Sequence, residues 1–188
     1  MKIKFLIILI PFLFAGPAFS QGKKDVKKYR IKSITVMKTF TQNGKEVTLK
    51  DTYEKFDSDA NLTEEILYND SGRVTYHESY QFNKNGDITE EVTYLDETKV
   101  TKRIVTKYNS TGDRIEESEY DGNGKLVEKD MFSYNANGDR IAEISFDGNN
   151  NITKKVTNIY DSRGLRTERR TYDGKNNLVA LRKYTYEF

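Results

Sequence analysis

Carboxylates are the side chains best placed for catalysis in this sequence, because the chain has no Cys and a single His. The strand register inferred below sets Glu64 opposite Glu78 and Glu116 opposite Asp130. Two close carboxylates can share a proton or flank a glycosidic bond. Glycan hydrolysis by such a pair is therefore one hypothesis, and the alternative is a charged sheet surface without catalysis.

The single histidine, His77, would have to serve any Ser/His/Asp arrangement. The inferred register places it on a solvated face, opposite Glu65, where an exposed member of a charge ladder is the better interpretation. The absence of Cys excludes thiol nucleophiles and sulfur-ligated metals. The acidic turns lack the bidentate Glu that closes a calcium loop, and no glycine-rich phosphate loop occurs. We expect no metal and no cofactor.

A second candidate site is a surface of tyrosine and arginine, in which each Tyr is followed six residues later by an Arg. The residues are Tyr108 and Arg114, Tyr134 and Arg140, and Tyr160 and Arg166. A guanidinium over a phenol ring contributes roughly 0.5–1 kcal/mol. Rows of rings also suit carbohydrate binding, although in a thin sheet the same rings are needed as the core.

These candidates sit on a repeat. An aromatic residue followed by a turn rich in Asn and Asp recurs from Phe56 to Tyr172, at spacings that alternate between 12 and 14 residues. The unit is therefore 26 residues long and holds two turns. The fourth residue after the aromatic is Gly or Asn in all but two turns, and these types enter positive φ at least cost. The exceptions, Ala60 and Thr98, predict strained or remodelled turns.

The segments between turns are seven to nine residues long and rich in Thr, Val, Ile and Tyr, which indicates strands. We predict an all-β fold: an up-and-down antiparallel meander of about 12 strands in one curled sheet, either an open spiral or barrel-like. Strict alternation from each turn predicts one half-apolar face that carries the rings and one wet face. It also opposes Glu91 to Arg103 and Glu143 to Lys155, as acid–base pairs across the hairpins.

The unit aromatic, Asp or Asn, two residues, Gly, one residue, aliphatic is clearest in YNDSGRV from Tyr68 and YDGNGKL from Tyr120. It resembles the YD repeats of bacterial Rhs proteins and their animal relatives, over residues 56–188. The resemblance implies a long antiparallel sheet that spirals into a shell. Some members of that family enclose a toxin and others are surface or adhesion proteins. We expect a short member without a toxin or core domain.

The first 20 residues have the pattern of a secretory signal peptide: Lys2 and Lys4, an apolar stretch, then the small residues Ala18 and Ser20. Residues 21–29 are predicted to be a flexible basic leader and residues 30–188 the β-repeat domain. Removal of residues 1–20 leaves 29 basic and 29 acidic residues, which argues against nucleic-acid binding through a general positive field. We expect no membrane span after that removal, and export to the periplasm, exterior or surface of a bacterium.

The function expected from these features is that of an exported, non-enzymatic β-repeat protein that acts as a binding or cell-envelope surface scaffold, with carbohydrate as one candidate ligand. Its partner would be a glycan or another envelope protein. One alternative is a structural fragment that pairs with itself or with a larger repeat protein through its exposed final strand, Leu178 to Glu187. The other is the glycan-acting hydrolase.

Overall fold

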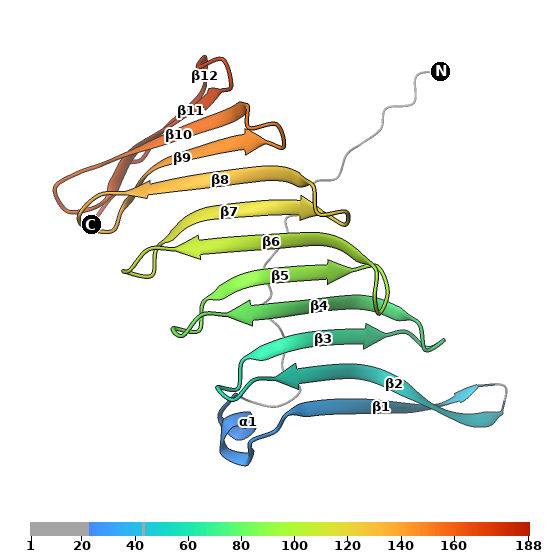
Figure 1. Cartoon of the computed structure of the whole chain (residues 1–188). Helices are drawn as coiled ribbons and strands as arrows, with labels where there is room; N and C mark the ends of the chain where they lie inside the picture. Colours follow the sequence, from blue (N-terminus) through green and yellow to red (C-terminus); the bar gives the residue numbers. More distant parts are fainter. Residues whose placement is uncertain (1–22, 43) are drawn as a thin grey trace, which may run out of the picture.

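The computed structural model describes residues 23–42 and 44–188, and the predicted signal peptide lies outside this part of the chain. One antiparallel sheet of twelve strands dominates it, with the strands in chain order (Figure 1). The elements are α1 (Lys23–Tyr29), β1 (Ser33–Gln42), β2 (Lys45–Phe56), β3 (Leu62–Tyr68), β4 (Val74–Phe82), β5 (Ile88–Tyr94), β6 (Val100–Tyr108), β7 (Arg114–Asp121), β8 (Leu126–Tyr134), β9 (Arg140–Asp147), β10 (Ile152–Tyr160), β11 (Arg166–Asp173) and β12 (Leu178–Lys183). The predicted meander is confirmed.

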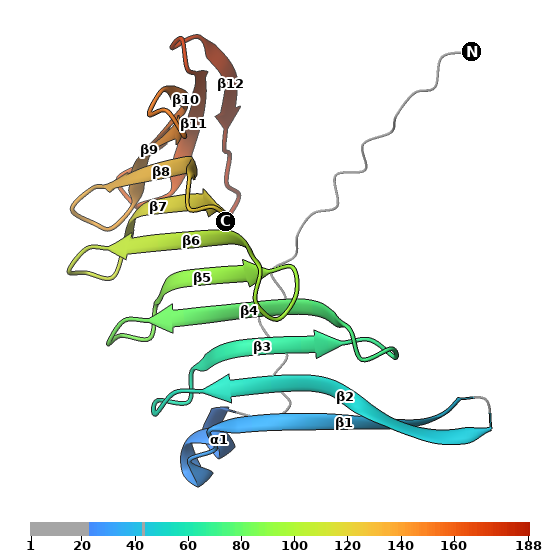
Figure 2. The ribbon, with the colours of Figure 1, turned by 45° about the vertical axis from the view of Figure 1, so that its right-hand side comes forward.

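The sheet is open. Among the described strands β1 pairs only with β2 and β12 only with β11, so the two edges do not meet. Figure 2 shows how strongly the sheet curls, since β10–β12 run steeply across the direction of β2–β6. Of the two forms that the sequence left possible, the structure adopts the open one.

The turns form as predicted. In the turn after β8, the Gly138 N–H donates to the Asn135 carbonyl at 3.1 Å, and Gly138 has φ +84°. The Asn135 Oδ1 accepts hydrogen bonds from the N–H groups of Asn137 and Asp139, which explains the Asn or Asp that opens these turns. Ala60 is strained, with φ +62°. The Thr98 turn is remodelled, with two N–H groups directed at the Asp96 carboxylate.

The predicted register is right at each turn and wrong beyond it. Tyr94 lies opposite Val100, but Thr93 lies opposite Lys102, so Thr101 is an extra, unpaired residue. The same bulge recurs in all ten hairpins from β2–β3 to β11–β12. Because side chains alternate with a period of two, one extra residue moves the rest of the strand to the other face.

The predicted acid–base pairs are consequently wrong. Glu91 lies opposite Ile104 and Glu143 opposite Val156, rather than Arg103 and Lys155. The single ring-bearing face is wrong for the same reason, because the register places the turn aromatics on two faces at opposite ends of the strands. Face 1 carries Tyr68, Tyr94, Tyr120, Phe146 and Tyr172, and face 2 carries Phe82, Tyr108, Tyr134 and Tyr160.

The predicted flexible leader is a helix over most of its length. Helix α1 packs its one buried side chain, Val26, against Phe56, Ala60 and Leu62 at the turn between β2 and β3. The helix ends where the Ile31 N–H donates to the Val26 carbonyl at 3.0 Å. We call this group of four buried residues the N-terminal cluster. In the described part of the chain no helix combines the length and apolar character that crossing a bilayer requires.

Candidate interaction surfaces

The tyrosines of the predicted Tyr/Arg surface lie half-buried on face 2, each at the same end of its hairpin. Their hydroxyl groups are already engaged. Tyr134 donates to the Arg114 carbonyl at 2.8 Å and Tyr160 to the Arg140 carbonyl at 2.9 Å. Tyr108 donates to Ile88 and Tyr186 to Arg166 in the same way, twenty residues back along the chain.

This tyrosine row, Tyr108, Tyr134, Tyr160 and Tyr186, ties each repeat to the one before it. A hydroxyl that donates to a half-buried carbonyl satisfies two polar groups that would otherwise lose their water. The rings therefore serve the sheet first. Only their faces are left to contact a ligand.

The arginines stack on rings in the predicted way in two of three cases. The guanidinium carbon of Arg140 lies 6.0 Å from the Tyr134 ring centre, and that of Arg166 lies 5.7 Å from the Tyr160 ring centre. Arg114 instead lies 4.7 Å from Phe132, and Arg140 also approaches Phe132, at 4.5 Å. Phe132 is thus held by the arginines of two neighbouring hairpins, and it is buried.

The three arginines differ in their charge partners. Arg114 forms an ion pair with Glu117, and Arg140 lies 3.9 Å from Glu143. Arg166 has no carboxylate partner among the described residues; the hydroxyl of Tyr160 raises its pKa, against the opposing effect of burial. One repeat after Phe132, the equivalent position is Asn158, whose Nδ2 donates to the Arg140 carbonyl at 2.8 Å. The Asn158 Oδ1 and the Arg166 Nε are both buried, and neither has a hydrogen-bond partner in the part of the chain that the structure describes.

The predicted carboxylate pairs are displaced by one residue. In their place Glu65 faces Glu78 and Glu117 faces Asp130, whereas Glu64 and Glu116 lie on face 1. Burial raises the pKa of the Glu65 carboxyl, and the charges of Glu54 and Glu78 raise it further.

The side chain of Glu78 joins two tyrosines in a small hydrogen-bond network. Its carboxylate accepts hydrogen bonds from the hydroxyls of Tyr76 at 2.5 Å and Tyr80 at 2.6 Å. Burial, and then these bonds to Glu78, raises the pKa of both tyrosines. Across residues 23–42 and 44–188, no three His, Asp or Glu side chains are grouped so that they could hold a metal ion.

His77 is buried, with 3% of its surface exposed, so the predicted exposed position is wrong. Its ring stacks on Tyr94 on face 1, with 4.1 Å between ring centres. The Nε2 lies 3.1 Å from Glu64 Oε1 and the Nδ1 lies 3.0 Å from the Asp96 carbonyl oxygen. Both ring nitrogens thus lie within hydrogen-bond distance of protein groups.

The last strand is the most exposed element of the sheet. Every residue of β12 is exposed, including Leu178 at 52%, Val179 at 60% and Leu181 at 47%. Phe188, beyond the strand, is 92% exposed. An apolar strand that is paired on one side only is a template for another strand. From the sequence, pairing through this edge was an alternative hypothesis.

Comparison with known proteins gives a family and several distant structural likenesses. A family model described as "Uncharacterised protein" matches residues 17–155. No curated protein matches the chain. Among solved structures, TcdB2-TccC3 without its hypervariable C-terminal region is 15% identical with a TM-score of 0.43; the match covers 77% of this chain but only 9% of that one.

Two further structures come from Bacteroides. A porin-like protein of Bacteroides uniformis is 13% identical with a TM-score of 0.36, over 82% of this chain and 56% of that one. A protein of unknown function from Bacteroides fragilis is 17% identical with a TM-score of 0.24, over 83% and 93%. At these TM-scores the likenesses carry no argument about function.

Proposed function

The chain belongs to the family described as "Uncharacterised protein", and from its own surfaces we propose that it is an exported, non-enzymatic β-repeat scaffold that assembles through its open C-terminal edge. The observation that carries this proposal is strand β12, which begins with four apolar residues and is exposed along its whole length; among the described strands it pairs only with β11. The resemblance of the repeat to YD repeats supports a scaffold role. Export rests on the signal-like pattern of residues 1–20.

The hydrogen bonds between β11 and β12 show which backbone N–H groups of β12 point away from the sheet. The Tyr184 N–H donates to the Thr167 carbonyl of β11 at 3.0 Å. Since alternate residues direct their N–H groups to the same side of a strand, Ala180 and Arg182 face β11. Leu181 and Lys183 then direct their N–H groups outward. The partner that fits this edge best is the same edge of a second copy, paired antiparallel about a two-fold axis.

Such a pairing also suits the side chains. When Leu181 lies opposite Leu181 of the second copy, their outward N–H groups face each other, and Arg182 and Lys183 oppose Ala180 and Val179 of that copy. The two copies then cover each other's exposed leucines without setting like charges directly opposite.

The test is sedimentation velocity of the full chain over a range of concentrations. We expect a concentration-dependent dimer that Leu181→Pro abolishes, because proline removes an outward N–H. Leu181→Ala is the matched control, which shortens the side chain but keeps the N–H and should still dimerise. A full chain that stays monomeric, or a Leu181→Pro variant that dimerises unchanged, would overturn the proposal.

The enzymatic alternative is tested on a panel of polysaccharides. Turnover that is lost in Glu117→Gln would replace the scaffold by a hydrolase that uses the facing pair Glu117 and Asp130. Carbohydrate binding at the Tyr/Arg surface stays a prediction, and it would have to use ring faces and guanidinium groups because the tyrosine hydroxyls are engaged.

A further inference from the structure

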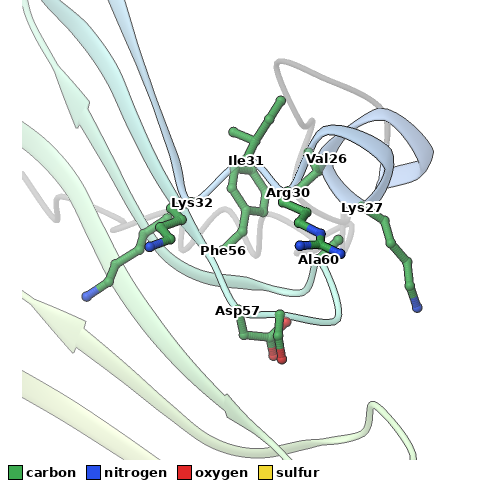
Figure 3. Close-up of a pocket in the computed structure, with 10 residues that line it drawn as sticks. Val26, Lys27, Arg30, Ile31, Lys32, Phe56, Asp57 and Ala60 are labelled. Carbon is green, nitrogen blue, oxygen red and sulfur yellow. The ribbon is translucent and has the colours of Figure 1, made fainter.

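A cavity of about 650 Å³ lies between helix α1 and the turn that joins β2 to β3 (Figure 3). Its apolar lining comes from Val26, Ile31, Phe56 and Ala60, three of which belong to the N-terminal cluster. Ligand pockets typically have volumes of about 300–1,000 Å³. The cavity is therefore large enough for a small organic ligand.

Basic residues surround this apolar lining. Lys27, Arg30, Lys32 and Lys55 all line the cavity. Lys27 lies 3.9 Å from the Asp59 carboxylate, whereas Arg30, Lys32 and Lys55 form no ion pair with any described residue. Among the described residues of the lining, Asp57 is the one acid, and its carboxylate accepts hydrogen bonds from the Asp59 and Asn61 amides.

Arg30 occupies a backbone position that favours glycine. It follows α1 with φ +52°, and its N–H donates to the Lys27 carbonyl at 3.3 Å. Glycine is the usual residue at such a left-handed helix end, and another side chain there costs about 1 kcal/mol. In Figure 3 the Arg30 side chain extends toward the turn that carries Ala60 and Asp57. The chain thus places a cation at the cavity where glycine would be more stable.

We propose that this cavity binds a long-chain fatty acid, with the alkyl chain against Val26, Ile31 and Phe56 and the carboxylate among the cations. An apolar lining with unpaired cations at its margin complements an amphiphilic anion. Burial of the alkyl chain away from water favours binding, and the carboxylate head group can accept charge-assisted hydrogen bonds. The site is separate from the β12 edge, so it stands or falls independently of the proposed assembly.

The test is calorimetric titration of the purified full chain with dodecanoate below its micellar concentration. We expect saturable binding of one molecule per chain, and no binding of dodecanol or dodecyltrimethylammonium. Arg30→Gly should weaken dodecanoate binding about tenfold or more, the size expected for losing a charge-assisted hydrogen bond. The same variant should unfold at an equal or higher urea concentration, since glycine suits φ +52°.

Lys24→Gln is the matched control, because Lys24 is an exposed cation of α1 that does not line the cavity. It should bind dodecanoate like the unchanged chain. Absence of dodecanoate binding, equal binding of dodecanol, or unchanged binding by Arg30→Gly would each overturn the proposal. Loss of binding in Lys24→Gln to the same extent would also overturn it, because the effect would then be one of net charge.

Discussion

The two ends of the sheet differ in how far their apolar side chains are covered. At the N-terminal corner, helix α1 covers a turn and buries Val26, Phe56, Ala60 and Leu62. At the C-terminal edge, β12 buries no side chain, and three of its apolar residues are about half exposed or more. The turn after β2 and the turn before β12 both belong to the repeat, so the difference lies in what covers them.

This contrast shows how a single-layer sheet obtains a core. A strand of the array buries side chains only against neighbouring strands, and most strands therefore have intermediate exposure. The helix adds a second layer at one corner, and buried apolar side chains gather there. Terminal repeats of such arrays usually carry a cap, and an end without one is where a partner gains most by binding.

Two leucines, one at each end of the sheet, should differ strongly in what they contribute to stability. Leu62→Ala should lower the free energy of unfolding by about 3 kcal/mol, because Leu62 is 3% exposed within the N-terminal cluster. Leu178→Ala is the matched variant and should cost less than about 0.5 kcal/mol in the monomer, since Leu178 is 52% exposed. Urea unfolding at low protein concentration measures both. Equal losses would show that the two ends are packed alike, contrary to the difference described above.

The turns were predictable because their chemistry is local. A Gly or Asn in the left-handed conformation and an Asn or Asp that accepts turn N–H groups need no long-range contact. The register could have been predicted from one further feature of the sequence. In all ten hairpins a β-branched residue follows three positions after the Gly or Asn of the turn, or after Ala60 or Thr98 in the two exceptions. These residues are Thr63, Thr75, Thr89, Thr101, Ile115, Val127, Ile141, Thr153, Thr167 and Val179.

Those residues are the extra residues of the bulges. Thr101, for example, is unpaired between Val100 and Lys102, and its hydroxyl donates to the Thr93 carbonyl at 3.1 Å. The register predicted from strict alternation contains no such extra residue. The facing carboxylates and His77 were therefore placed on the wrong faces. Helix α1 could not be predicted in the same way. Val26 is its one buried side chain, and the stabilisation from burying Val26 depends on contact with a turn thirty residues further along the chain.

A smaller effect tests whether packing on face 2 weakens toward the open edge. Phe132 fills a position between two arginines, and one repeat later Asn158 fills the equivalent position with a buried Oδ1 that has no hydrogen-bond partner among the described residues. Asn158→Phe should raise the free energy of unfolding by about 1 kcal/mol by removing that atom and adding a ring beside Arg140 and Arg166. The Arg140 carbonyl keeps the hydrogen bond from Tyr160.

Asn158→Ala controls for loss of the amide alone and should be less stable than the unchanged chain, because it leaves a space that no ring fills. Thermal unfolding of the three proteins measures the order. If the alanine and phenylalanine variants were equally stable, the arginines would gain nothing from a ring at this position, and the difference between the two repeats would not be one of packing.

The two ends of the sheet should also differ in how their stability depends on pH. Near the N-terminal corner, burial and then the charges of Glu54 and Glu78 raise the pKa of Glu65 above its usual 4.5. A carboxyl whose pKa is raised by folding opposes folding when ionised, so its cost is present at neutral pH and disappears as the pH falls below 4.5. Glu65→Gln should therefore raise the free energy of unfolding at pH 7, and the gain should vanish in acid.

In the C-terminal half, the backbone N–H of Leu165, more than the opposing desolvation, lowers the pKa of Asp161. Asp161→Asn should lose stability at pH 7, and that loss should fade as the pH falls through the lowered pKa. Urea unfolding at a series of pH values compares the two variants, and a pH dependence of the same sign in both would contradict the assignment of opposite charge environments to the two halves.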